Sequence, residues 1–414
     1  MVLINLYFTN LLGANNFGRY IFVLSWIILI ATFLSSYLHL PIIRFITSYI
    51  HQKSFNLLKG CISLIYKYIF FTTAVTFIIF LIIFFFLNEI FNRDYLETFI
   101  IGSVGIFFIS YINVNKSILF GLNRSPEGMF SELIVRPFSI ILFILIIYFQ
   151  DIVLSTKLAI SITITSYFVA MLFSFIFVNF FKPEFNSIQS KYNYVEWKKV
   201  LLPFIFVSFG EILLSRADII ILGVLRLPSE VGIFAIATLI VSSISMITNA
   251  IDSVVSSRFA KLFSKKDLKG AQESLFRMLI VSNAITLPIS IIILFFGAEI
   301  LSLFGEEFVG GTTALRILVG GHLFNSLMGP LGMILGINGQ EKSLAKITII
   351  SGIINIIILF ILVPSFGIEG AALSRLITIL FFATVQGYLI WNKTGILPSF
   401  LSYFSILNKI DEKK

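Results

Sequence analysis

Charged side chains interrupt two long apolar stretches of the sequence, where they could bind ions or phosphates. Glu211, Arg216 and Asp218 lie in one stretch, and Arg375 lies in another near the carboxyl end. On a helix, Glu211, Ser215 and Asp218 would share one face, because residues three and four apart are neighbours. A charge at the bilayer centre costs about 2.5–3.5 kcal/mol on insertion scales, so such groups usually face a cavity or pair with one another.

The spacing favours a pair between Asp218 and Arg375. Both residues would lie in the outer halves of their helices, whereas Arg216 would point largely away from Asp218. Two interpretations stay open for these three residues: a structural salt bridge, or groups that line a cavity. Glu211 would lie about 18 Å from the inner end of its helix at ~1.5 Å per residue. Its isolation near mid-membrane favours a functional role.

A second group of cations is predicted near the inner ends of helices in the first half of the chain. Arg44, Lys116 and Arg136 either mark this side with positive charge, with their heads reaching the interface, or form a basic mouth for a pyrophosphate. Asp252 falls within about one helical turn of the same surface. We expect its carboxylate to be solvated.

Other chemistries lack their motifs. The sequence has no Gly-Lys dipeptide, hence no Walker A loop, and ATP is not expected to be the direct energy source. Its three histidines are far apart, so neither a metal site nor a nucleophile site is predicted. Cys61 is the single cysteine, which excludes an intrachain disulfide. Because the basic residues are scattered, no nucleic-acid partner is expected, and we predict no cofactor and no catalytic residue.

The composition predicts a membrane protein. Of the 414 residues, 58% are hydrophobic and 12% are charged, with a mean hydropathy of +1.00, whereas soluble domains average about a quarter charged residues. One globular core cannot bury this much apolar surface, so the excess must face lipid. A span needs about 20 apolar residues, and the length therefore allows roughly a dozen helices. A soluble enzyme is excluded.

Eleven complete spans and one short apolar segment are expected. The short segment, Val2–Gly13, would cover about 18 Å of a layer about 30 Å thick. It resembles the second half of a first helix, and we expect the natural chain to start upstream of Met1. The spans are Phe17–Leu38, Tyr68–Leu87, Thr98–Phe120, Leu133–Phe149, Leu158–Phe181, Val200–Leu225, Val231–Val255, Phe276–Gly297, Ala314–Gly336, Leu344–Val363 and Ile368–Ile390.

The distribution of charge predicts the orientation. Most of the 30 Lys and Arg residues fall on one side of these spans, including the cluster between Arg258 and Arg277. Positive loops resist translocation, so this side is expected to be cytoplasmic, together with both termini.

Two internal repeats indicate that the chain consists of two halves. Leu11–Tyr20 is similar to Leu225–Phe234, and Leu119–Asn123 is similar to Ile334–Asn338, at nearly the same offset along the chain. Six helices would separate the copies, so the halves would have the same membrane orientation and a pseudo-two-fold axis along the membrane normal. The predicted fold is an all-α polytopic membrane protein with six-helix lobes at 1–190 and 191–414.

Several motifs resemble one known family, the polysaccharide-exporter flippases of the multidrug/oligosaccharidyl-lipid/polysaccharide exporter superfamily. They are Leu12–Tyr20, Ile43–Phe45, Arg136-Pro137, Asp218–Gly223, Glu230–Phe234, Ile334–Lys342 and Asn355–Ala372. The resemblance implies two lobes facing a central cavity, alternating access, and export of a lipid-linked sugar. It also implies a bacterial cytoplasmic membrane and surface polysaccharides such as the O-antigen of lipopolysaccharide. The short first helix departs from the family pattern.

Residue roles follow from combining this resemblance with the charges. Arg44, Arg136, Arg216 and Arg375 are the candidate groups for the pyrophosphate of a polyprenyl-linked oligosaccharide, and Glu211 or Asp218 is the candidate for a coupling proton or sodium ion. Membrane lipids and a glycan polymerase are possible partners. The alternatives are a multidrug or cation antiporter, whose cavity would be acidic, and a polytopic glycosyltransferase or sugar polymerase, which would need catalytic acids in an external loop.

Overall fold

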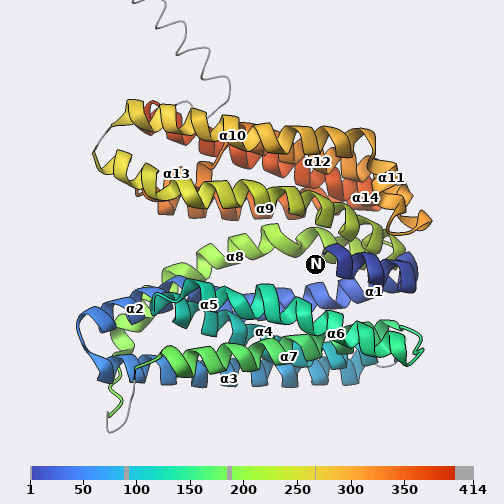
Figure 1. The fold of residues 1–414 in the computed structure, drawn as a ribbon, viewed down its shortest axis with the longest axis horizontal. Helices are drawn as coiled ribbons and strands as arrows, with labels where there is room; N and C mark the ends of the chain where they lie inside the picture. The colour runs from blue at the N-terminus through green and yellow to red at the C-terminus, as the bar shows by residue number, and fades with distance from the viewer. Residues whose placement is uncertain (1, 88–92, 184–188, 266, 397–414) are drawn as a thin grey trace, which may run out of the picture. The chain divides into compact units, whose positions relative to one another are not determined.

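The protein is built from helices and loops, without a strand in the described parts of the chain. The computed structural model describes residues 2–87, 93–183, 189–265 and 267–396 (Figure 1). Two compact units are present, and we call Leu3–Ile212 lobe 1 and Leu213–Lys414 lobe 2. The division falls inside one helix, Tyr194–Leu225. The expected boundary between residues 190 and 191 stays a prediction.

Lobe 1 contains seven α-helices before the shared helix α8. They are α1 (Val2–Ser35), α2 (His39–His51), α3 (Phe55–Leu87), α4 (Arg93–Gly121), α5 (Ser125–Phe130), α6 (Arg136–Phe149) and α7 (Thr156–Phe181), with short helical turns at Ser36–Leu38 and Ser131–Val135. The most buried long helix is α4, which packs against α2, α3 and α7. Its most apolar window is 56% buried, against 17% for α3, so α3 carries much of the exposed apolar surface.

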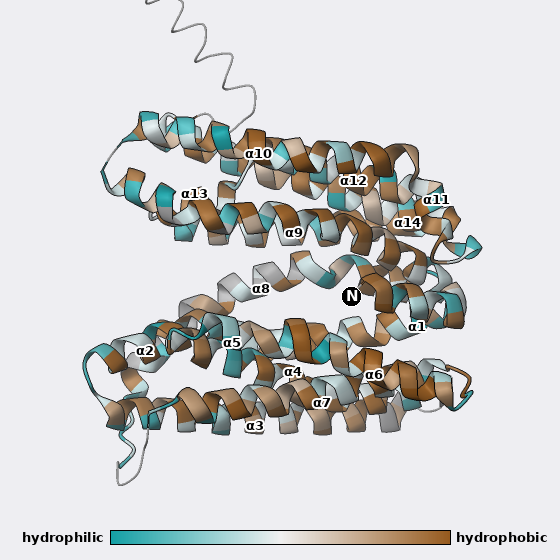
Figure 2. Ribbon diagram, viewed as in Figure 1, coloured by the Kyte–Doolittle hydropathy of each residue, from teal (hydrophilic) through white to brown (hydrophobic). Residues whose placement is uncertain are grey.

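Lobe 2 continues from α8 (Tyr194–Leu225) with six further α-helices. They are α9 (Pro228–Ser264), α10 (Leu268–Phe295), α11 (Gly297–Ser302), α12 (Thr312–Met328), α13 (Leu331–Ile337) and α14 (Glu341–Thr394), with a short turn of helix at Glu306–Gly311. Here α12 packs against α9, α10 and α14. Hydrophobic residues dominate the long helices of each lobe, and hydrophilic ones gather near helix ends and connections (Figure 2).

The lengths and hydropathy of the helices confirm an all-α multi-pass membrane protein. Nine helical stretches within the described residues are long and apolar enough to cross a bilayer. Two of them contain a pair of helices joined at a bend, with φ of 69° at Gly13 and 53° at Gly367. These bends coincide with the ends of the short first segment and of the span predicted to stop at Val363.

Several helices extend beyond the predicted spans, most of all α3, which begins at Phe55 and not at Tyr68, and two other spans differ in ways that affect the site. The expected helix Ala314–Gly336 is broken, because Pro330 has no N–H to donate and Gly329 has φ of 84°. The expected helix Leu133–Phe149 begins earlier, at Ser125, where Pro126 occupies the first turn that tolerates proline. A π-helical turn at Ser131–Val135 then carries the chain into α6 without a break.

The helix α2 was not expected as a separate element. It spans 13 residues, which is too short to cross a bilayer. Its Ile42, Phe45 and Ile46 are buried, and Thr47 Oγ1 donates to Gly121 O at 3.1 Å. The helix therefore packs at the level of the turn between α4 and α5.

Candidate transport site

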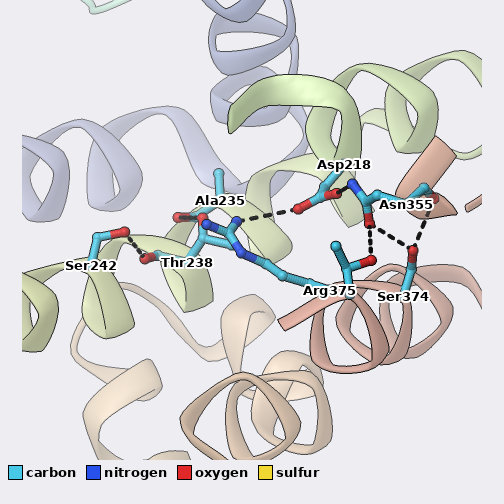
Figure 3. A network of polar contacts seen from close by, with 8 residues as sticks. Asp218, Ala235, Thr238, Ser242, Asn355, Ser374 and Arg375 are labelled. Atoms are coloured by element: carbon cyan, nitrogen blue, oxygen red, sulfur yellow. Dashed lines mark hydrogen bonds and ion pairs between the residues drawn. The ribbon is translucent and has the colours of Figure 1, made fainter. Parts of the chain in front are cut away.

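A buried ion pair in lobe 2 joins α8 to the second arm of α14. Arg375 Nη1 donates to Asp218 Oδ2 at 3.2 Å, as the sequence predicted (Figure 3). The Asp218 side chain is 3% exposed and that of Arg375 is 34% exposed. A buried carboxylate without a partner would be strongly unfavourable, so the guanidinium stabilises it.

Asn355 satisfies the other oxygen of this carboxylate. Its Nδ2 donates to Asp218 Oδ1 at 2.8 Å, and its Oδ1 accepts hydrogen bonds from Ser374 Oγ at 2.9 Å and Thr378 Oγ1 at 3.2 Å (Figure 3). Asn355 lies on the first arm of α14, whereas Ser374, Arg375 and Thr378 lie on the second. The network therefore joins three helical segments that are distant along the chain.

The bend in α14 brings its two arms close enough for this network. A Cβ added at Gly370 would lie 2.4 Å from the backbone oxygen of Leu362, so only glycine fits. The following Ala371 and Ala372 are fully buried and keep the contact narrow. These small residues were among the motifs that carried the resemblance, and their role here is close helix packing.

Arg375 also borders a partly open pocket of about 280 Å³ in lobe 2. Residues of α8, α9, α12 and α14 line it, and the polar ones include Thr238, Ser242, Ser245, His322, Asn325 and Thr378. Within the Asp218–Arg375 pair, the cation Arg375 is therefore the more exposed group. Such an arrangement can hold an anionic group while Asp218 keeps the guanidinium in place.

In lobe 1, the half-buried guanidinium of Arg136 contacts an aromatic residue of α7. Arg136 Nη1 donates to Tyr167 Oη at 2.8 Å, and its Cζ lies 4.6 Å from the centroid of the same ring. One turn away on α7, Thr163 Oγ1 is 3.0 Å from Tyr20 Oη. Sequence reasoning missed both tyrosines, because aromatic residues are common in every apolar span of this chain.

The predicted depth of Arg136 is wrong. Because the helix starts at Ser125 and not at Leu133, Arg136 lies eleven residues inside it, or about 16 Å at 1.5 Å per residue. Arg44 is exposed on α2, which packs at the level of the turn where that helix begins. The two arginines therefore lie at different depths and do not form a single mouth at one level.

The remaining predicted residues have mixed outcomes. Arg216 is half-buried on α8. The side chain of Glu211 lies outside the described residues, so its predicted role stays a prediction. Lys116 forms an ion pair with Glu132 at 2.7 Å, which ties α4 to the π-helical turn.

Asp252 lies twelve residues before the end of α9, deeper along its helix than predicted, and its expected solvation stays a prediction. The residue is half-buried and lines a partly open pocket of lobe 2 together with residues of α10, α12, α13 and α14. The signal for both pockets is present in the sequence as polar residues three or four apart along α9: Thr238, Ser242 and Ser245 line the pocket beside Arg375, and Asn249 and Asp252 line this one.

Comparisons with known proteins agree with the fold and the motifs. The family described as "Polysaccharide biosynthesis protein" matches residues 2–263, and the MatE family matches residues 203–361. A probable low-salt glycan biosynthesis flippase, Agl15 of Haloferax volcanii, is 29% identical over 194 residues, covering 47% of this chain but only 40% of that protein. An uncharacterized membrane protein of Methanocaldococcus jannaschii, MJ1068, is 23% identical over 94% of this chain and 78% of its own.

Solved structures share the fold at low sequence identity. An inward-facing multidrug resistance MATE family transporter of the MOP superfamily has a TM-score of 0.74 at 15% identity, covering 96% of this chain and 94% of its own. The lipid II flippase MurJ has a TM-score of 0.70 at 15% identity, covering 94% and 85% respectively. These relatives are transporters and flippases and not enzymes. The chain belongs to the polysaccharide biosynthesis protein family and has the two-lobe fold of the exporters and flippases of the MOP superfamily.

Proposed function

We propose that this protein moves a polyprenyl-pyrophosphate-linked oligosaccharide across the cytoplasmic membrane by alternating access, for the synthesis of a surface polysaccharide. The observation that carries the proposal is the sign of the charge at the lobe 2 pocket beside Arg375. Arg375 borders that pocket with a third of its side chain exposed, while Asp218 is almost completely buried behind it. A cation in this position suits a phosphate-bearing substrate.

The amphipathic nature of such a substrate supports the same proposal. A polyprenyl tail can remain in lipid while guanidinium groups neutralise the pyrophosphate during crossing. Arg375 in lobe 2 and Arg136 in lobe 1 are the membrane-embedded candidates, and Arg216 and exposed Arg44 are further candidates. The similarity to a glycan flippase and the match to the polysaccharide family favour this class of substrate.

The orientation and the driving force belong to the same proposal. We place both termini in the cytoplasm, because most basic residues fall on that side. An inward gradient of protons or sodium ions supplies the energy, with Asp218 or Glu211 as coupling groups, and a glycan polymerase acts on the exported product. O-antigen of lipopolysaccharide and a bacterial inner membrane are the specific forms of this proposal.

The test is transport by purified protein in liposomes that contain a polyprenyl-pyrophosphate oligosaccharide. We expect the glycan to become accessible to an added glycan-modifying enzyme on the opposite side of the membrane. Double replacement of Arg375 by Gln and Asp218 by Asn keeps the site neutral, so the variant should fold and lose most of this movement. Arg316→Gln is the matched control, because Arg316 is exposed and bonds the backbone of Leu294 at 3.0 Å.

The multidrug antiporter is the second candidate, since the MatE family matches part of lobe 2 and a MATE transporter shares the fold. It predicts that the same liposomes accumulate a lipophilic cation against a gradient. Unimpaired glycan movement by the double variant, together with cation accumulation, would refute the flippase and support the antiporter.

A further inference from the structure

A second pocket in lobe 2 is lined by an acidic side chain. Its volume is about 260 Å³, it is partly open, and residues of α9, α10, α14 and the break between α12 and α13 line it. Its oxygen-bearing side chains are those of Thr248, Asn249, Asp252, Ser282, Asn325, Ser326 and Gln386. Asn325 and Phe382 also line the cavity beside Arg375, so the two spaces adjoin.

The broken helix lines this pocket with residues on both sides of the break, among them Ser326, Gly329 and Leu331. Because Pro330 lacks an N–H, Ser326 O cannot bond to it in the usual helical manner and accepts instead from Asn283 Nδ2 at 3.3 Å. The N–H of Leu331 donates to Gly329 O at 2.9 Å and not to Leu327 O. The carboxyl end of α12, where the negative end of a helix dipole lies, therefore borders the pocket that Asp252 also lines.

Glycine is required to make this break. Gly329 has φ of 84°, a conformation that side-chain-bearing residues rarely adopt, and a Cβ there would approach Leu279 Cδ2 to 3.0 Å. The break is thus built into the sequence and is held by packing against α10. In membrane transporters, interrupted helices of this kind commonly provide carbonyl oxygens for cations.

Two polar groups at this cavity await a partner. Within the described part of the chain, Asp252 has neither a hydrogen bond nor an ion pair. Gln386 is 2% exposed, and its Nε2 has no hydrogen-bond partner among the described residues. Rotating this amide would place its oxygen at the same position. Arg258 and Arg277 line a third, mostly apolar pocket with Ile251 and Val254, and Met278 borders both this pocket and the one that Asp252 lines.

We propose that this cavity is a binding site for a single alkali cation, with Asp252 as its charged ligand. Neutral oxygens from Asn249, Ser326, Gln386 and the end of α12 complete the site. One carboxylate balances one monovalent charge, whereas a calcium site usually gathers several carboxylates. Neither Asp218 nor Arg375 lines this pocket. Arg375 already compensates the charge of Asp218, so Asp252 is the carboxylate that is left to bind a cation.

The position suggests how ion binding could reach the transport site. Asn325 and Phe382 border both cavities, so a cation at Asp252 changes the surroundings of the space that Arg375 borders. This consequence rests on the proposed function, because it makes the cation the coupling ion of the flippase. The binding site itself does not depend on the identity of the transported molecule.

The binding test uses the full-length purified protein in lipid nanodiscs without glycan. Its melting temperature is measured in rising sodium chloride, with N-methyl-D-glucamine chloride holding the ionic strength constant. A ligand that binds only the folded state raises the melting temperature in a saturable way. We expect such a rise with sodium, and Asp252→Asn should weaken the apparent affinity about tenfold or more because the charged ligand is lost.

Two further variants make the result decisive. Asp218→Asn should keep the sodium response, and Gln386→Leu should weaken it even if Asp252→Asn fails to fold. No saturable response in the unmodified protein would overturn the proposal. So would a response that survives Asp252→Asn but disappears in Asp218→Asn, or an unchanged response in Gln386→Leu.

Transport separates this inference from the proposed function. Sodium binding without glycan movement under any gradient would contradict the flippase and leave the cation site intact. Glycan movement without sodium binding would contradict the cation site alone.

Discussion

The most buried helix of lobe 1, α4, is continuous, whereas its counterpart in lobe 2, α12 with α13, is broken. In lobe 1, α4 runs unbroken from Arg93 to Gly121, and Asn115 bonds Tyr66 Oη at 2.7 Å and Ser174 Oγ at 2.8 Å. In lobe 2, the equivalent helix by the internal repeat is interrupted at Gly329-Pro330 beside a polar cavity. Asn115 on the continuous helix of lobe 1 thus has its polar groups paired, whereas the interrupted helix of lobe 2 borders a pocket. Lobe 1 has a pocket elsewhere, of about 460 Å³, between α1 and the start of α7 beside Arg19 and Lys157.

The half-buried guanidinium groups of the two lobes also differ in their partners. Arg136 in lobe 1 donates a hydrogen bond to the neutral Tyr167 and lies near the Glu132 carboxylate, which already pairs with Lys116, whereas Arg375 in lobe 2 pairs with the buried Asp218. A neutral partner loses little when the cation is removed, whereas a buried carboxylate loses its compensation. The comparison therefore predicts unequal effects of the same substitution in the two lobes.

The largest effect is expected from Arg375→Met. It leaves Asp218 uncompensated and should destabilise the protein by about 3 kcal/mol, at the low end for a broken buried pair because Arg375 is partly exposed. Adding Asp218→Asn should restore most of the folded protein. The amount of monodisperse protein after purification measures both variants, and equal yields of the single and double variants would contradict the argument.

A smaller loss is expected when the closed network of lobe 1 is opened. Asn115→Ala leaves the hydroxyls of Tyr66 and Ser174 without their partner and should cost about 2 kcal/mol. The matched change in lobe 2, Ser326→Ala, should cost less, because water in the adjoining cavity can replace the lost hydroxyl. Denaturant unfolding of both variants measures the two losses. An equal or larger loss for Ser326→Ala would contradict the argument.

Removing the guanidinium of lobe 1 should have a still smaller effect on stability. The contacts that Arg136→Met removes include a hydrogen bond and a cation–π contact with Tyr167, and these two should together contribute about 1.5 kcal/mol to the unfolding free energy. Glycan movement in liposomes should nevertheless fall, and Arg136→Lys should partly restore it by keeping the charge. A loss of stability as large as that of Arg375→Met would refute the distinction between the lobes.

The smallest effect is expected for Arg44→Gln. Arg44 is exposed on α2, and exposed substitutions usually change stability by less than about 0.5 kcal/mol. If Arg44 contributes to substrate capture, high ionic strength should reduce glycan movement more in the unmodified protein than in the variant. Salt screens exposed charges, and the variant has already lost this one. Identical salt dependence would leave Arg44 with its effect on topology alone.

Part of the site could be predicted because energetic costs in lipid act on single residues. Asp218 and Arg375 each carry a charge that hydrocarbon disfavours, and their similar depth left few other partners. Asn355 and Gln386 are uncharged, so the sequence alone gives no energetic reason to expect a partner for either of them. Their roles depend on which helices meet, and the bend at Gly367 and the break at Gly329 decide this.

The sequence by itself determined the membrane class, the two-lobe organisation and the charged residues that need compensation. These follow from hydropathy summed over about 20 residues and from the repeat of short motifs, which do not require knowledge of contacts. The tertiary structure decided the depth of Arg136, the break beside Pro330 and the cavity around Asp252. Each depends on where a backbone N–H or a polar side chain finds its partner, and packing between distant segments sets that position.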